Sequence, residues 1–87
     1  MKSVMHTNEY GDKFWRSQGY YHREDGPALE RKNGEVQWYH FGLRHREDGP
    51  AIEFINGHKE WWLDGIEYTN QEYKKRMRYL KLKQLLR

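Results

Sequence analysis

Two nearly identical segments hold the residue types that bind metals or move protons. His22-Arg23-Glu24-Asp25-Gly26-Pro27-Ala28-Leu29-Glu30 recurs as His45-Arg46-Glu47-Asp48-Gly49-Pro50-Ala51-Ile52-Glu53, with eight of nine positions identical. Histidines and carboxylates at matching positions could meet on one edge of a sheet and form a metal or hydrolytic site. Stacked copies, however, place identical side chains about one hairpin apart, whereas the ligands of one metal ion converge within about 2.0 to 2.6 Å of it.

A turn-forming role explains the two segments better than catalysis does. Asp-Gly-Pro bends the chain, while the arginine and histidine cover the neighbouring aromatic residue. A nucleophile with a base and an orienting third group cannot be named. We therefore expect neither an enzyme nor a cofactor or metal. A hydrolase that uses His22, His45, Asp25 and Asp48 is the less favoured alternative.

The 23-residue spacing continues on both sides of these segments. Downstream the matched residues are Asn33-Gly34 with Asn56-Gly57, Trp38 with Trp61, and Gly42 with Gly65; upstream, Gly11, Trp15 and Gly19 indicate a third, degenerate copy. A fixed period of this length is typical of repeat architectures, in which each unit buries its apolar face against the next. The sequence thus predicts a mostly β fold: a single antiparallel meander of stacked 23-residue hairpins over residues 1–68, followed by one C-terminal helix over 69–87 that packs on the sheet or extends from it.

The Asn-Gly pairs predict two-residue type I′ turns, because Asn tolerates and Gly accepts the positive φ that such turns need. Pairing outward from them sets Leu29 opposite Trp38 and Ile52 opposite Trp61. One face, expected to be the core, then collects Trp15, Leu29, Val36, Trp38, Ile52, Phe54, Trp61 and Leu63. The other face collects Ala28, Glu30, Gln37, Tyr39, Ala51, Glu53, Glu60 and Trp62, so Tyr39 and Trp62 become candidate partner-binding residues.

Composition limits the classes of protein to which the chain can belong. Its 87 residues fit one small domain, in which aromatic residues, 16% of the total, supply most of the hydrophobic driving force. The chain has no cysteine, which removes disulfides and fits a reducing cytoplasm. No apolar run is long enough to span a membrane, and the N-terminus lacks the apolar segment of a signal peptide. We expect a cytoplasmic protein without a membrane partner.

The C-terminal segment has a helical pattern. Thr69 and Glu72 form a predicted capping box, and Tyr73, Met77 and Leu80 make a stripe suited to covering the core face of the sheet. A second stripe, Tyr79, Leu82 and Leu86, lies on roughly the opposite side of the helix. Residues 74–87 carry a charge of +7 and the remaining 73 residues a charge of −4.

The repeated unit resembles the MORN repeat, a hairpin module stacked into a single elongated sheet. The resemblance rests on the Asn-Gly turns, a Gly-x-x-His approach and a regularly placed aromatic residue, and it covers Gly11 to Tyr68. The His-Arg-Glu-Asp-Gly-Pro motif stands in place of the usual His-Gly-x-Gly core. It is similar to the motif of a divergent MORN-like group of small proteins of tailed phages and bacteria. The resemblance implies a scaffold without catalytic residues, and a phage-type inhibitor of a bacterial host or anti-phage defence protein, for example of CRISPR type.

The basic helix leaves three interpretations open. The first is contact with a bacterial protein, or self-association as a homodimer, through the Tyr79, Leu82 and Leu86 stripe. The second is nucleic-acid binding through Lys74, Lys75, Arg78 and Lys81, although the charges are spread around the helix instead of forming one stripe. The third is a solvated helix that only closes the core or meets an acidic surface. Protein contact is the favoured interpretation, because one small sheet cannot bury this much apolar surface.

Overall fold

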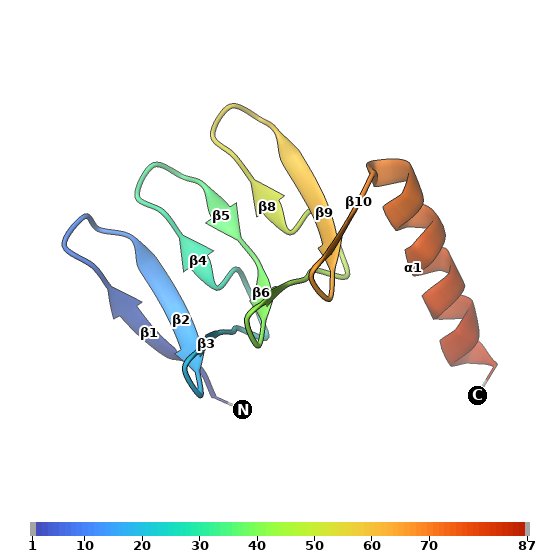
Figure 1. Ribbon diagram of the computed structural model, residues 1–87, viewed down its shortest axis with the longest axis horizontal. Coiled ribbons are helices and arrows are strands. Elements are labelled where there is room, and N and C mark those ends of the chain that lie inside the picture. The colour runs from blue at the N-terminus through green and yellow to red at the C-terminus, as the bar shows by residue number, and fades with distance from the viewer. Residues whose placement is uncertain (1, 87) are drawn as a thin grey trace.

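The computed structural model describes residues 2–86 as one thin sheet with a helix at its end (Figure 1). The molecule measures 47 × 32 × 17 Å. Seven strands follow one another antiparallel in the order β1-β2-β4-β5-β8-β9-β10, with β3 paired to β2, and β6 with β7 form a separate pair. The expected mostly β meander with one C-terminal helix is confirmed. The elements are β1 (Val4–Thr7), β2 (Lys13–Ser17), β3 (Tyr20–Tyr21), β4 (Leu29–Glu30), β5 (Val36–Gln37), β6 (Tyr39–His40), β7 (Leu43–Arg44), β8 (Ile52–Glu53), β9 (Lys59–Leu63), β10 (Ile66–Tyr68) and α1 (Asn70–Leu85).

Three two-residue turns have positive φ at both central residues, which is the type I′ geometry. They are Gln18-Gly19 (φ 54° and 83°), Phe41-Gly42 (45° and 85°) and Asp64-Gly65 (48° and 80°). They close the β2–β3, β6–β7 and β9–β10 hairpins, in which Ser17 faces Tyr20, His40 faces Leu43 and Leu63 faces Ile66. Asp-Gly at 64–65 is a recognised signal for such a turn. The sequence reasoning missed it because it began from the Asn-Gly pairs.

The predicted type I′ turns at Asn33-Gly34 and Asn56-Gly57 were wrong. The Arg31 N–H donates to the Glu35 carbonyl, so the loop holds three residues, and Gly34 has a φ of 101° at its last position. The same loop recurs where the Phe54 N–H donates to the His58 carbonyl. In the first loop, Asn33 uses its side-chain oxygen to accept the Glu35 N–H. This Asx bond favours a type I turn, which leaves only the glycine in the left-handed region.

One extra loop residue moves the register by one position, and every side chain then changes face. Leu29 lies opposite Gln37 instead of Trp38, and Ile52 lies opposite Glu60 instead of Trp61. The grouping of Trp38 with Leu29 and of Trp61 with Ile52 on one face was therefore wrong, although Leu29, Ile52 and Leu63 of the predicted core are buried. One face holds Phe14, Leu29, Gln37, Ile52 and Glu60, and the other holds Lys13, Glu30, Val36, Glu53 and Lys59.

Within residues 2–86 no second layer covers the sheet, and arginines from its loops and from β7 cover several of its aromatic residues. The guanidinium carbon lies 3.9 Å from the ring centre of the aromatic partner for Arg23 on Trp15, 4.0 Å for Arg46 on Trp38 and 5.0 Å for Arg44 on Trp62. The apolar side chains that are buried form a short list: Ala28, Leu29, Ala51, Ile52, Leu63 and Tyr73. Arginine stems and guanidinium planes take the place of a covering layer.

Helix α1 starts with the predicted capping box. Thr69 Oγ1 accepts the Glu72 N–H at 3.1 Å, and Glu72 Oε1 accepts the Thr69 N–H at 2.9 Å. Hydrogen bonding to the backbone N–H of Thr69, and after it to the Thr69 side chain, holds the pKa of the Glu72 carboxyl below its usual value. The predicted end of the helix, residue 87, lies outside the described residues.

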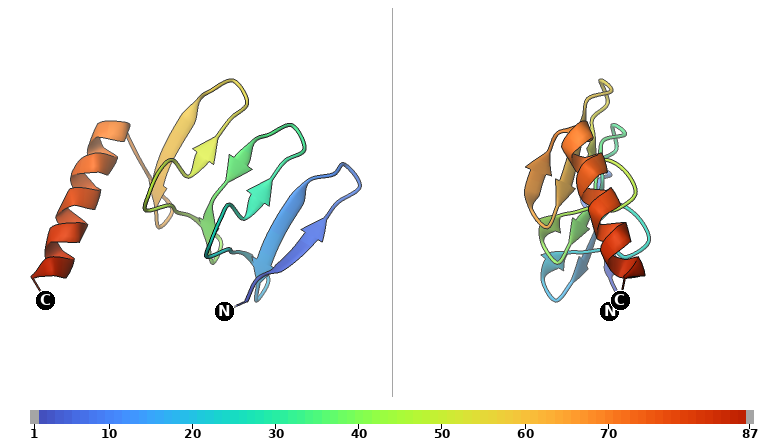
Figure 2. Two further views of the ribbon diagram at one scale, coloured as in Figure 1. Left: turned by 180° about the vertical axis from the view of Figure 1, so that it is seen from behind. Right: turned by 90° about the vertical axis from the view of Figure 1, so that its right-hand side faces the viewer.

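Of the two expected placements of α1, packed on the sheet or extending from it, the structure shows the second, and the stripe suited to covering a face of the sheet does not do so. The helix lies beside β9 and β10 at the end of the sheet (Figures 1 and 2). Tyr68 ends β10 and Thr69 already caps the helix, so no residues are left for a connection back over the sheet. Of the stripe that was expected to pack, Tyr73 is buried, and Met77 and Leu80 are half-buried.

Candidate interaction surface

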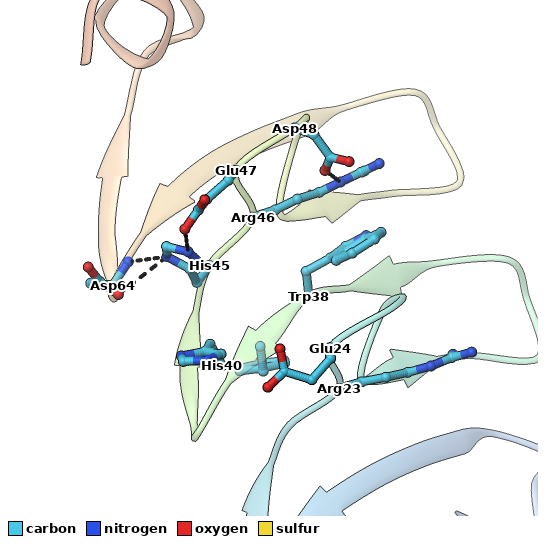
Figure 3. A pocket seen from close by; sticks show the side chains of 10 residues that line it. Arg23, Glu24, Trp38, His40, His45, Arg46, Glu47, Asp48 and Asp64 are labelled. Atoms are coloured by element: carbon cyan, nitrogen blue, oxygen red, sulfur yellow. Dashed lines mark hydrogen bonds and ion pairs between the residues drawn. The ribbon is translucent and has the colours of Figure 1, made fainter. Parts of the chain in front are cut away.

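The two His-Arg-Glu-Asp-Gly-Pro loops hold neighbouring hairpins together through their histidines, and Figure 3 shows these contacts for His45. His22 Nδ1 accepts the Phe41 N–H at 3.1 Å, and its Nε2 lies 2.9 Å from Glu24 Oε1. His45 Nδ1 accepts the Asp64 N–H at 3.0 Å, and its Nε2 lies 3.0 Å from Glu47 Oε2. Since each Nδ1 accepts, the proton of the neutral ring is on Nε2 and is donated to the glutamate. Each histidine thus joins its own loop to the next type I′ turn.

The arginine of each loop holds the turn together through ion pairs and a hydrogen bond to nearby residues. Arg23 pairs with Asp25 and Glu30, at 3.1 and 3.0 Å, and donates to the Pro27 carbonyl. Arg46 makes the same contacts with Asp48, Glu53 and Pro50, although its distance to Glu53 is 3.5 Å. A Cβ added at Gly26 or Gly49 would lie 2.9 Å from the guanidinium carbon. Glycine is therefore needed there for the arginine to stack on its tryptophan, and the expected turn-forming role accounts for these residues.

A metal does not fit these loops. Within residues 2–86, the ligand atoms of His22, Glu24 and His40 lie within 4.8 Å of one another. His22 Nδ1, however, accepts a backbone N–H, so its Nε2 carries a proton and cannot coordinate an ion without losing that bond. The second loop keeps the same histidine and glutamate geometry but has Leu63 where the first has His40. The contact between histidine and glutamate is therefore a feature of the repeated turn and not of a metal site.

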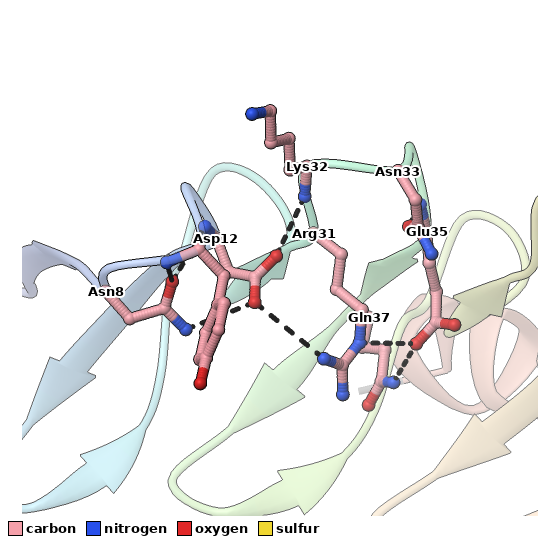
Figure 4. A network of polar contacts seen from close by, with 8 residues as sticks. Asn8, Asp12, Arg31, Lys32, Asn33, Glu35 and Gln37 are labelled. Atoms are coloured by element: carbon pink, nitrogen blue, oxygen red, sulfur yellow. Dashed lines mark hydrogen bonds and ion pairs between the residues drawn. The ribbon is translucent and has the colours of Figure 1, made fainter.

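A separate polar network ties together the tips of the first two hairpins (Figure 4). Asp12 accepts the Lys32 N–H at 2.9 Å and the Asn8 side-chain amide at 3.1 Å, and Arg31 pairs with Glu35 at 3.1 Å. The hydrogen bonds to Asp12 lower the pKa of its carboxyl. The network fixes the spacing of the hairpins and leaves the loop tips to solvent.

The two aromatic residues predicted to bind a partner from the sheet are half-buried and internally bonded. The Tyr39 hydroxyl donates to Gln37 Oε1 at 2.7 Å, and the Tyr39 ring packs against Tyr21 at 5.3 Å. Trp62 Nε1 donates to Glu60 Oε1 at 2.9 Å, beneath Arg44. These side chains fill the face of the sheet, and their polar atoms are already satisfied.

The predicted residues on α1 are exposed. Tyr79, Leu82 and Leu86 have exposed fractions of 53%, 56% and 86%, and all four predicted cations are exposed: Lys74, Lys75, Arg78 and Lys81. Arg76 lies 5.4 Å from the Tyr79 ring centre. Leu85, with 80% exposed, was missed by sequence reasoning, although it directly precedes Leu86. Exposed leucines and a tyrosine thus run along α1 among its basic side chains.

Tyr73 anchors the helix to the second loop. Its hydroxyl donates to the Arg46 carbonyl and accepts the Gly49 N–H at 3.3 Å. Burial raises the pKa of this phenol above its ordinary value. Below this anchor a groove of about 510 Å³ separates α1 from the sheet, lined by Leu63, Ile66, Met77 and Leu80 among others. The helix is therefore attached near its N-terminus and diverges toward its C-terminus.

Comparison with known proteins returned no family model, no curated protein and no solved structure that matches the chain. Among the described residues, the one helix is too short and too polar to cross a membrane.

Proposed function

We propose that the chain is a non-enzymatic, MORN-like binding protein of the bacterial cytoplasm, and that α1 occupies a surface of a bacterial protein. In this proposal it acts as a phage-type inhibitor or accessory factor directed at a host or anti-phage defence protein. The observation that carries the proposal is the exposed apolar stripe of α1, with basic side chains on both of its flanks.

The positions around the helix support this assignment. At about 100° per residue, Tyr79, Leu82 and Leu86 lie within about 60° of one another and opposite the buried Tyr73. Lys74, Arg78 and Lys81 run along one flank of the stripe, and Arg76 and Lys83 along the other. An apolar stripe with charged borders is the pattern of a helix that docks in a groove. The matching partner surface is an apolar groove rimmed by carboxylates.

The same charges argue against two copies of α1 packing on each other. Glu72 is the one acidic residue of the helix, while six basic residues lie between Lys74 and Lys83. Two such helices would bring like charges together, which costs free energy at close range. The proposed occupant is accordingly a different protein.

The test is affinity capture from bacterial lysate with three forms of the chain: unmodified, Leu82→Asp, and the matched control Ile55→Asp. Ile55 is 67% exposed and lies in the loop between β8 and β9, outside α1. We expect one bacterial protein to be captured equally by the first and third forms and roughly tenfold less by L82D, the loss typical of a central interface residue. The purified partner should lose its own activity when the unmodified chain binds it. Equal capture by all three forms would refute the proposal.

Nucleic-acid binding is the second candidate, because Lys74, Arg78 and Lys81 do line up on one flank of α1. Its test is a binding assay with DNA and RNA at low and high salt, using the unmodified chain and a form in which these three residues are glutamate. Binding that depends on the three cations, and that weakens by nearly one log unit per contact for each log unit of salt, would support this candidate. Capture of the protein partner that survives nuclease treatment would favour the first candidate instead.

A further inference from the structure

The two edge strands of the sheet differ in what lies beside them, and β1, at the N-terminal end, is the more open one. β10 has α1 beside it, whereas β1 is the outermost strand and, within residues 2–86, pairs with β2 alone (Figure 1). All four residues of β1 are exposed, including Val4 at 61% and Met5 at 47%. Proteins usually protect such an edge with lysine, proline or a bulge. β1 reads Val-Met-His-Thr and has none of these.

The backbone groups at this edge can be assigned from the neighbouring strands. Trp15 donates its N–H to the Ala28 carbonyl and accepts the His22 N–H, so both of its backbone groups point away from β1. Met5 lies opposite Trp15 and must therefore direct its own N–H and C=O outward. Thr7 does the same, two residues along. The open edge thus offers two donors and two acceptors within β1.

We propose that β1 pairs antiparallel with β1 of a second copy of this chain, extending the sheet across a twofold axis. A twofold axis normal to the sheet keeps equivalent faces on the same side, so the centre of the pairing must be a residue opposite its own copy. Centring on His6 sets Met5 opposite Thr7 of the second copy and forms four backbone hydrogen bonds within the strands. A register centred on Met5 forms only two backbone hydrogen bonds within the two β1 strands. The register is therefore centred on His6.

A second copy fits this edge for two further reasons. β1 carries no lysine, arginine, aspartate or glutamate, so an identical strand meets no like charge, although a third of the chain's residues are charged. The pairing is also self-limiting, because α1 stands beside the strand at the opposite edge. One open edge for each chain gives a closed dimer, whereas two would give a fibre.

The register makes a cross-linking test specific. The chain has no cysteine, so His6→Cys and Met5→Cys each supply a single thiol. His6 would form a non-hydrogen-bonded pair with its copy, with Cα atoms about 4.5 Å apart, which a disulfide can bridge. The two Met5 residues would be offset by two residues, about 8 Å apart, beyond disulfide range. We expect H6C to form a disulfide-linked dimer under mild oxidation, and M5C and the exposed control Ile55→Cys to form no disulfide cross-link.

Sedimentation over a concentration series tests the unmodified chain without relying on these variants. It should approach the mass of two chains, and Met5→Lys, which adds a protective charge to the edge, should return it to one, with Ile55→Lys as the unchanged control. The proposal is overturned if the unmodified chain stays monomeric, if H6C cross-links no faster than I55C, or if M5C cross-links in place of H6C. L82D should dimerise normally, and M5K should still capture the partner of α1, so the two proposals can fail separately.

Discussion

The two nine-residue loops have nearly the same sequence and the same internal contacts, yet they lie in different surroundings. The His22 ring is fully buried and stacks on Phe41, with ring centres 3.8 Å apart. The His45 ring is partly exposed, because Asp64 stands where the first loop has Phe41. The second loop in turn receives the Tyr73 hydroxyl from α1. Identical local sequence thus determines the turn, while residues 19 to 27 positions away determine how deeply it is buried.

This difference predicts unequal effects from equal substitutions. His22→Ala should lower the free energy of unfolding by about 3 kcal/mol, because it leaves a cavity against Phe41 and removes two hydrogen bonds. His45→Ala, at the more exposed site, should cost about 1 kcal/mol. Urea denaturation of the two variants measures both values. Equal losses would mean that the stack on Phe41 adds no stability to the first loop.

Phe41→Asp gives the first loop the neighbour of the second. It removes the ring stacked on His22 but keeps a residue type that tolerates the positive φ of this turn position. We expect a loss of about 1.5 kcal/mol, and a ring of His22 that becomes accessible. Denaturation gives the stability, and the rate of His22 modification by diethyl pyrocarbonate gives the exposure. If the ring stayed as protected as in the unmodified chain, burial would have to come from elsewhere in the hairpin.

Tyr73→Phe removes the hydroxyl that only the second loop receives. The expected cost is about 1 kcal/mol, with faster hydrogen exchange at the Gly49 amide but not at Gly26. The pKa of Tyr73 is raised in the folded chain, so the neutral phenol is the form that stabilises the fold. Its contribution is present below the unfolded pKa near 10 and is lost as the pH rises through the folded pKa. The unmodified chain should therefore lose more stability above pH 10 at this site than Y73F does.

The smallest effect is expected at the glutamates that accept from the two histidines. Glu24→Gln and Glu47→Gln replace exposed carboxylates by amides that still accept a hydrogen bond, so each should cost less than about 0.5 kcal/mol. Paired denaturation curves would resolve a larger cost. A loss above about 1 kcal/mol at Glu24 alone would indicate that the buried His22 depends on a charged partner.

The class of fold and the helix start could be predicted because they depend on local signals. The Thr69 and Glu72 capping box and the alternation between turns and strands are legible in the chain itself. The register could not be predicted, because Asn33 supports either a two-residue or a three-residue turn, and its side-chain bond to the Glu35 N–H decides between them. The face on which Trp38 lies depended on that bond, and the face of Trp61 on the matching bond from the His58 N–H to the Asn56 side chain.

The candidate interaction surface, like the fold, could be predicted from the sequence only in part. The exposure of Tyr79, Leu82 and Leu86 followed from helical spacing, which is independent of the sheet. Tyr39 and Trp62 were assigned to a face by the mistaken register, and their internal hydrogen bonds to Gln37 and Glu60 could not be read from the sequence. The open edge at β1 was missed because no pattern within four residues shows which strand lies outermost.

The thin sheet also determines how the chain can reach its native state. Hairpins touch mainly their neighbours: the Trp38 N–H bonds to the Ala51 carbonyl 13 residues on, and the side-chain hydrogen bonds between hairpins span 19 or 20 residues. A β-sandwich of similar size must instead close long loops before its two sheets can meet. Folding rates rise as contacts become more local, so this sheet can grow from any one hairpin, one unit at a time, faster than a sandwich could assemble.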